Sequence, residues 1–358
     1  QKFAADLTLG LIKASDDLHF AVVLDPDEVV ANRRAKTEGE ATTQADRDRE
    51  RANNFGFRDA RRLDGGLAYI RFDFFADPEY AQDIAAGAMR FAEGAAGLII
   101  DLRYNNGGTL EMAQLLMSYL YPAGKEQEFF DYNYNESGRR VDRSQWNLPA
   151  VIGQRSPEMP VVVLTGSTSF SSAEWMAFSL QRLGRATIIG EQTSGGAHPV
   201  TRVPIDDRFM LQAPFGQIRD PVEGRDFEGV GVTPDIAVPA SDALLEAQRF
   251  LLKARADAGD AAAQWTLTPI EFAISGQTVS LDDAVGAYEG RTLVRTANGL
   301  AYHWRGRFVL ALAPIGQDLF AVEGTDDYRF RLVRENGRVT GLERVWKSGD
   351  TATYRRLD

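Results

Sequence analysis

The sequence predicts an α/β protein with a largely parallel sheet, followed by an antiparallel β module. Short apolar runs at 97–103 and 159–166 have the composition of buried strands, and segments with helical spacing alternate with them. After residue 285 the pattern changes to short strand-like runs separated by turn residues. The length of 358 residues exceeds that of one ordinary domain, which agrees with a division into an α/β part and a β module.

The N-terminal region, residues 1–54, combines three segments. Phe3, Leu7 and Leu11 lie four residues apart, which predicts a helix over 2–14. The run 18–24 is typical of a strand and includes His19. Residues 25–54 are rich in charge and poor in aromatic side chains, so we expect a surface segment that is either a solvated helix or a flexible loop.

An α/β core is predicted over residues 55–241, because expected strands alternate with expected helices there. A helix over 242–258 and a linker-like stretch make up residues 242–268. The expected core strands are 65–75, 97–103, 159–166 and 186–191, and the expected core helices are 78–93, 112–120 and 174–183.

Residues 269–358 are predicted to form a small antiparallel barrel or sandwich of about seven strands. Asn298-Gly299, Asn336-Gly337 and the sequence at 348–350 have the composition of hairpin turns. This module carries no catalytic motif, and its His303 is predicted to be structural.

Composition excludes several kinds of site. The chain has no cysteine, which rules out disulfides, thiolate metal sites and a cysteine nucleophile. It has three histidines, and we expect no metal and no cofactor. The net charge of −11 disfavours nucleic acid as a partner, and no apolar run approaches the roughly 20 residues that span a bilayer. Because the chain begins at Gln1, we expect a processed or truncated product without its signal peptide.

Three segments have residues suited to chemistry. In "IDLRYNNGG", a buried strand runs into Gly107 and Gly108, which predicts either a tight turn or backbone N–H groups aimed at an anion. In "STSFSSAEW", Ser171 precedes a helix and Glu174 follows three residues later, which is the spacing of a capping box and also suits a nucleophile. In "GEQTSGGAHP", two glycines precede His198, which predicts a loop lying close to other backbone.

Taken together and in this order, these motifs and "EGVGVTPDIAVP" resemble the C-terminal processing (tail-specific) serine peptidases. The resemblance covers roughly residues 1–240 and is strongest to the branch that includes interphotoreceptor retinoid-binding protein and the tricorn core. It implies a crotonase/ClpP-like core fold and an exported, periplasmic or other extracytoplasmic location. The PDZ domain common in the family is not evident, since the charged segment before residue 55 is too short for one.

The resemblance also implies roles for individual residues. Ser171 matches the nucleophile, and Gly196 stands where many members carry the lysine of a Ser–Lys dyad. His19, in "SDDLHFAVV", then matches the general base of a His-containing branch, and Glu228 matches its orienting carboxylate. The remaining assignments are an oxyanion hole from Gly107, Gly108 and Ser172, a substrate loop from Gly195, Gly196 and His198, His198 as a second candidate base, and Glu223 or Asp226 as alternatives to Glu228.

The expected function is that of a metal-independent serine endopeptidase acting on polypeptides through an acyl-enzyme. A non-catalytic carrier of a hydrophobic ligand, or a scaffold, on the same fold is the alternative. An acyl-transferring or thioester-processing enzyme is a third possibility, because the core also resembles the crotonase-like spiral. The sequence leaves the oligomeric state open.

Overall fold

The computed structural model describes residues 1–15, 17, 19–38, 44–136, 139–297, 299–306 and 308–357. The chain forms two compact units, Gln1–Ala247 and Gln248–Asp358. The predicted α/β core and the predicted C-terminal antiparallel β module are both confirmed.

The central sheet of the first unit has six strands in the order β12-β8-β7-β4-β3-β2. It is parallel except for β2, which pairs antiparallel with β3. Every residue of β4 and β7 is buried, as expected for central strands covered on both faces. The strands are β2 (Phe57–Leu63), β3 (Leu67–Phe72), β4 (Gly97–Asp101), β7 (Val161–Thr165), β8 (Thr187–Gly190) and β12 (Ile236–Ala237).

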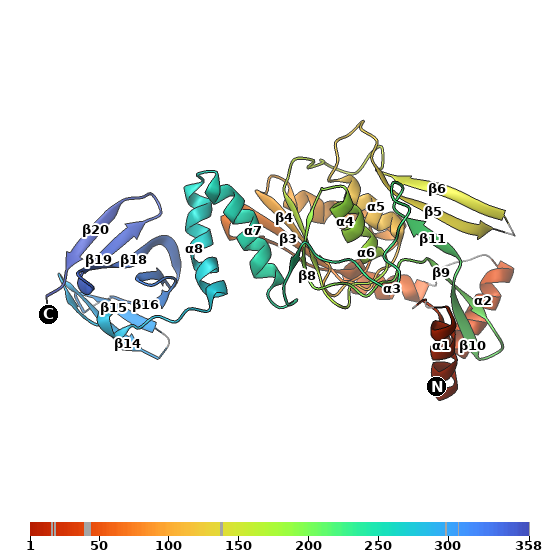
Figure 1. Cartoon of the computed structure of the whole chain (residues 1–358), viewed down its shortest axis with the longest axis horizontal. Helices are drawn as coiled ribbons and strands as arrows, with labels where there is room; N and C mark the ends of the chain where they lie inside the picture. Colours follow the sequence, from red (N-terminus) through yellow and green to blue (C-terminus); the bar gives the residue numbers. More distant parts are fainter. Residues whose placement is uncertain are drawn as a thin grey trace. The chain divides into compact units, whose positions relative to one another are not determined.

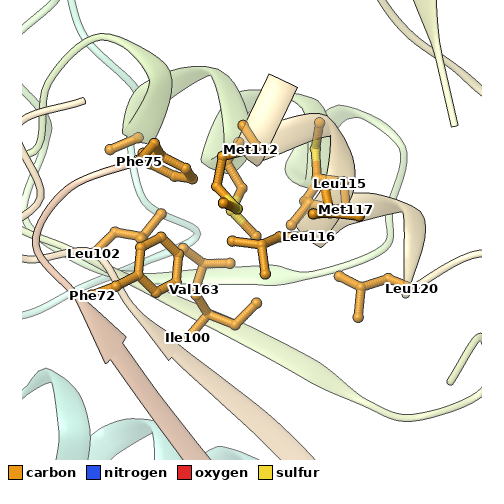
Figure 2. Packing of buried hydrophobic residues seen from close by; sticks show 14 of the residues in the cluster. Phe72, Phe75, Ile100, Leu102, Met112, Leu115, Leu116, Met117, Leu120 and Val163 are labelled. Carbon is orange, nitrogen blue, oxygen red and sulfur yellow. The ribbon is translucent and has the colours of Figure 1, made fainter. Parts of the chain in front are cut away.

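Three helices follow strands of this sheet and pack against one another in sequence order (Figure 1). Asp77 and Thr109 cap the first two through their side-chain oxygens. Met112 and Leu116 lie against Ile100 and Val163 of the sheet in the main core (Figure 2). The helices are α4 (Pro78–Ala92), α5 (Leu110–Ser118) and α6 (Ser172–Arg182).

Two three-stranded antiparallel sheets, with orders β1-β10-β9 and β11-β5-β6, complete the strands of this unit (Figure 1). The pairing of β1 with β10 brings the N-terminal segment beside a region almost 200 positions later in the sequence. Only β1 among these six strands was expected from the sequence. They are β1 (Ala21–Leu24), β5 (Glu128–Glu136), β6 (Arg139–Trp146), β9 (Val200–Pro204), β10 (Phe209–Pro214) and β11 (Gly216–Arg219).

The N-terminal helix is present as α1 (Lys2–Ser15). The charged segment 25–54 contains α2 (Pro26–Glu38) and α3 (Gln44–Ala52), so the helical alternative holds over these parts, while residues 39–43 lie outside the described residues. Short 3-10 turns, η1 (Asn54–Gly56) and η2 (Asp64–Gly66), flank β2. Among the described residues, no helix is both long enough and apolar enough to cross a bilayer.

In the second unit, eight strands form one antiparallel sheet in sequence order, one more than expected. A two-residue turn at Asn336 and Gly337, both with positive φ, joins β18 to β19 as predicted, whereas Asn298 lies outside the described residues. The sheet consists of β13 (Gly286–Tyr288), β14 (Arg291–Thr296), β15 (Gly299–Trp304), β16 (Phe308–Pro314), β17 (Leu319–Val322), β18 (Thr325–Glu335), β19 (Arg338–Trp346) and β20 (Thr351–Arg355), with η3 (Asp282–Ala284) before it.

Two helices precede this sheet in the chain, α7 (Ala243–Asp257) and α8 (Ala261–Ser275). The second corrects an expectation, since the sequence reads as a linker there. Asp260 accepts hydrogen bonds from the N–H groups of Ala262 and Ala263, and the left-handed Gly276 ends the helix. These caps define a helix that the Ala-rich composition alone did not indicate.

Candidate active site

The residues singled out from the sequence gather at one edge of the central sheet. Strands β8, β7 and β4 are neighbours and run parallel, so their carboxyl ends lie side by side. The segments after these ends carry Gly107 and Gly108, Ser171, and His198. This edge is where ligands bind in many open α/β sheets.

Ser171 lies at the start of α6 in a backbone conformation that L residues rarely adopt, with φ 56° and ψ −122°. Its N–H donates to Glu174 Oε2 at 2.8 Å, and the two residues form the predicted capping box. Capping and nucleophilic attack are compatible, because the cap engages the backbone of Ser171. Strain of this kind costs about 1–3 kcal/mol and is concentrated at functional sites.

Gly107 and Gly108 lie directly beside the serine, with φ of 99° and 133°. A Cβ on Gly107 would come within 2.8 Å of Ser171 Cβ. A Cβ on Gly108 would lie 2.2 Å from the carbonyl oxygen of Phe75. The pair is therefore required by close backbone approach, as its sequence suggested.

Gly108→Ala is expected to destabilise the protein by about 3 kcal/mol or more, because both the left-handed φ and the collision with Phe75 backbone oppose it. Gly94→Ala is the matched control, since Gly94 also has a positive φ of 69° but nothing within 4 Å of the added Cβ. It should cost only the conformational strain, about 1 kcal/mol. Urea denaturation of both variants measures the difference, and equal losses would contradict the steric argument.

Two backbone N–H groups in the lining of the cavity that Ser171 also lines have no acceptor among the described residues. The N–H groups of Gly108 and Ser172 make no hydrogen bond within the described residues. The N–H of Gly107 instead donates to Asn105 Oδ1 at 2.9 Å. Asn105 is fully buried and donates in turn to Phe72 O, so it fixes the loop that holds the glycines.

Glu174 is fully buried and joins two segments of the chain, the start of α6 and the loop at 193–196. Its oxygens accept hydrogen bonds from the N–H groups of Ser171, Gly195 and Gly196 and from Thr193 Oγ1, at 2.5–2.8 Å. Burial raises the pKa of Glu174, and the four donors oppose that rise. The carboxylate thus links the predicted nucleophile to the predicted substrate loop.

Glu174→Gln should lower the free energy of unfolding by several kcal/mol. The amide group of glutamine cannot accept from the two donors that share one carboxylate oxygen, and each buried donor left without an acceptor costs about 1–3 kcal/mol. Glu126→Gln, at an exposed carboxylate, is expected to change stability by less than about 0.5 kcal/mol. Thermal and urea denaturation provide the comparison; a Glu174 variant as stable as the control would refute this account.

Gly196, at the position of the dyad lysine, lies against Phe170. A Cβ built on Gly196 would be 2.2 Å from Phe170 Cε2 and 2.4 Å from Cζ. The ring of Phe170 therefore fills the space into which a side chain at position 196 would extend. The absence of a lysine here has a steric basis.

His19 is buried, with 2% of its surface exposed. Its Nδ1 faces two carboxylates, at 3.3 Å from Asp17 Oδ1 and 3.5 Å from Glu228 Oε2. Its backbone is held by a hydrogen bond from its N–H to Asp17 Oδ1 and one from Gln212 to its carbonyl. The other ring nitrogen, Nε2, is buried and has no hydrogen-bond partner among the described residues.

His198 lies 6.2 Å from His19, measured between ring centroids, and shares its carboxylates. Its Nδ1 is 2.6 Å from Asp17 Oδ2, and its Nε2 is 3.7 Å from Asp226 Oδ2. The Asp226 carboxylate raises the pKa of His198 to about 9, and Asp17 and Glu228 act in the same direction. Burial of the ring opposes this rise. A ring that stays protonated at neutral pH cannot serve as a general base there.

Glu228 connects both histidines to the loop before β9. Its Oε2 accepts from the N–H of Ala197 at 2.6 Å and of His198 at 3.2 Å, while Oε1 is buried without a partner in the described residues. Asp226 accepts a hydrogen bond from the Glu228 N–H and lies near His198. Glu223 instead forms an exposed ion pair with Arg225. Of the three carboxylates considered from the sequence, Glu228 is the one that reaches His19.

A cavity of about 320 Å³ opens beside Ser171. Ser171, Ser172, Gly108 and His198 line it, whereas His19 does not. Trp175, Tyr132, Phe215, Leu110 and Ile218 also line it, together with Glu111, so the cavity has both apolar and polar surface. Within the described residues, neither histidine ring makes a hydrogen bond to Ser171.

Residues 66–238 match peptidase family S41. The resemblance to C-terminal processing peptidases predicted from the motifs is confirmed, because curated relatives of that name match this chain. The protease of Bartonella bacilliformis is 28% identical over 49% of this chain and 40% of its own length. The carboxy-terminal processing protease CtpA of Bacillus subtilis is 32% identical over 32% of this chain and 23% of its own.

The chain spans about two fifths of the length of the first of these curated relatives. Among solved structures, the photosystem II D1 C-terminal processing protease matches at 22% identity with a TM-score of 0.39, covering 52% of this chain and 46% of that one. A peptidase from Parabacteroides merdae matches at 17% identity with a TM-score of 0.49, covering 68% of this chain and 80% of that one.

Sequence reasoning passed over several residues of this site. Asp17 has no catalytic role in the sequence-based assignment, yet it contacts both His19 and His198. Phe170 and Thr193 were not singled out, and no local signal distinguishes them. A buried asparagine between a strand and two glycines is the one pattern from which a structural role could have been inferred.

Proposed function

We propose that the protein is a serine peptidase in which Ser171 attacks the substrate carbonyl and His19 accepts its proton. The observation that carries this proposal is the environment of His19. Its Nδ1 faces the carboxylates of Asp17 and Glu228, and its buried Nε2 has no partner among the described residues. That is the arrangement in which an imidazole holds its proton on Nδ1 and accepts another on Nε2.

The step proceeds as follows. As Ser171 Oγ bonds to the carbonyl carbon, its proton moves to His19 Nε2, and the nearby carboxylates stabilise the imidazolium. The developing oxyanion accepts hydrogen bonds from the N–H groups of Gly108 and Ser172, each worth about 2.7–4 kcal/mol in such sites. His19 then returns the proton to the leaving amine, and water hydrolyses the acyl-enzyme.

The serine and the imidazole must approach each other for this step. Catalytic hydrogen bonds are often absent in the unliganded state and form when substrate binds. The ring of Phe170, whose centroid is 5.1 Å from that of His19, lies next to Ser171 in the chain and is the side chain whose movement would allow the approach.

The substrate is proposed to be a polypeptide with an apolar or aromatic side chain next to the cleaved bond. The aromatic and aliphatic side chains that line part of the cavity beside Ser171, among them Trp175, Phe215 and Ile218, support this choice, and about 320 Å³ leaves room for such a side chain. An extracytoplasmic location remains part of the proposal, on the strength of the family resemblance.

A fluorophosphonate probe tests the proposed function. Intact-mass measurement should show one adduct per chain, and peptide mapping should place it on Ser171. No labelling of folded protein, together with no hydrolysis of a peptide library, would favour the carrier alternative. Hydrolysis of acyl thioesters in preference to peptides would favour the thioester alternative.

A further inference from the structure

Four side chains with metal-binding atoms meet around the predicted base. They are Asp17, His19, His198 and Glu228, and one ligand atom from each lies within 4.8 Å of all the others. The first two come from the segment before β1, and the other two from the loops before β9 and β12. Both imidazoles present Nδ1 to this cluster, and both carboxylates present an oxygen.

The spacing of these atoms suits a tetrahedral cation. Zinc binds imidazole nitrogen and carboxylate oxygen at about 2.0–2.2 Å, so neighbouring ligand atoms in a tetrahedron are separated by about 3.3–3.6 Å. The His19 Nδ1 distances to Asp17 and Glu228 are 3.3 and 3.5 Å, and His198 Nδ1 lies 3.6 Å from Glu228 Oε2. The distance of 2.6 Å between His198 Nδ1 and Asp17 Oδ2 would have to increase by up to about 1 Å when zinc binds.

Burial and charge favour the same ligand. The side chains of Asp17, Glu228 and His198 are 10%, 11% and 18% exposed, and that of His19 is 2% exposed. Zinc would replace the proton on His198 Nδ1, and its charge of +2 would then balance the two carboxylates, Asp17 and Glu228. Glu228 Oε1 is buried without a partner in the described residues, which leaves capacity for a second-oxygen contact.

We propose that Asp17, His19, His198 and Glu228 form a closed site for Zn²⁺ that switches off the peptidase. The inhibitory part of this inference rests on the proposed function, whereas the binding part does not. Four protein ligands with no open position are typical of zinc sites that do not perform catalysis themselves. Zinc bound here would prevent His19 from acting as the general base and would take no part in peptide hydrolysis itself.

The inhibition follows from the bonding of an imidazole. A neutral ring has one lone pair and one N–H. When the lone pair of His19 Nδ1 is bound to zinc, the proton must lie on Nε2, and Nε2 can no longer accept the proton of Ser171. Glu228 and Asp17 are occupied by the same ion. Metal binding and general-base catalysis by His19 therefore exclude each other.

Titration of the metal-free full-length protein with Co²⁺ and with Zn²⁺ tests the binding. We expect one Co²⁺ per chain with the intense visible absorption of tetrahedral coordination, displaced by one equivalent of Zn²⁺ measured calorimetrically. Asp17→Asn and His198→Ala should each weaken binding by at least about tenfold. His303→Ala and Ser171→Ala should bind as the unaltered protein does, and thermal denaturation in chelator checks that every variant is folded.

Absence of stoichiometric binding, an octahedral Co²⁺ spectrum, or binding that survives both ligand substitutions in folded protein would overturn the site. Stoichiometric zinc that leaves peptide hydrolysis unchanged would overturn the inhibition alone. Zinc binding by a protein that hydrolyses no peptide at all would contradict the proposed function while supporting the site. Inhibition by zinc that chelator reverses supports both.

Discussion

Ser171→Ala is expected to abolish fluorophosphonate labelling and to lower kcat/KM for peptide hydrolysis by about 10⁴-fold or more. The substitution removes the only oxygen at this position that can form the acyl-enzyme, while the Ser171 N–H bond to Glu174 Oε2 involves the backbone and is retained. Stability should therefore change little. Intact-mass labelling, peptide kinetics and urea denaturation of the same sample measure the three quantities.

Ser167→Ala is the control for this experiment. Ser167 lies four residues earlier, is exposed, and contacts its neighbours mainly through its backbone, whose N–H donates to Glu191 and whose carbonyl accepts from Ser194. Labelling and hydrolysis should be unaffected. If the Ser171 variant retained labelling, or the Ser167 variant lost it, the nucleophile would be wrongly assigned.

His19→Ala should cost as much activity as Ser171→Ala, because nucleophile and base act as one unit. For the same reason the double variant is expected to be no worse than either single one. His198→Ala should cost much less, since its ring is protonated at neutral pH and cannot accept the serine proton. Single-turnover kinetics on one peptide substrate compares the four proteins.

His303→Ala, in the C-terminal module, is the control histidine and should leave the kinetics unchanged. One result would assign the base to His198 instead of His19. His198 lines the cavity beside Ser171, whereas His19 does not, so a silent His19 variant with an inactive His198 variant would make His198 the base. If the double variant loses no more activity than either single variant, this result would support His19 and Ser171 as base and nucleophile.

The predictable part of the fold is the part with strong local signals. Strands β4 and β7 are continuous apolar runs, and the helices after them carry capping residues at their starts. The β5–β6 hairpin was missed because tyrosines alternate with polar side chains in one strand and charges dominate the other. Helix α8 was missed because an Ala-rich run after Asp-Ala-Gly resembles a linker until its caps are known.

The site was predictable only as separate pieces. Each motif indicated a turn, a cap or a loop, and the family resemblance supplied the roles. The approach of His19 to Glu228 depends on the pairing of β1 with β10, which no local pattern specifies. The sharing of Asp17 between two histidines is equally a consequence of tertiary structure, because the two rings are 179 positions apart in the sequence (198 − 19).

The contact between Gly196 and Phe170 has a consequence for how such a chain can evolve. A change of Gly196 to lysine alone would place its Cβ within 2.2–2.4 Å of the ring of Phe170. Shrinking Phe170 alone would remove packing from His19 without providing an amine. A lysine at position 196 therefore requires the ring of Phe170 to move or to be replaced by a smaller side chain. The phenyl ring of Phe170 thus occupies the position that the side chain of a dyad lysine would need, in a chain for which we propose a histidine base.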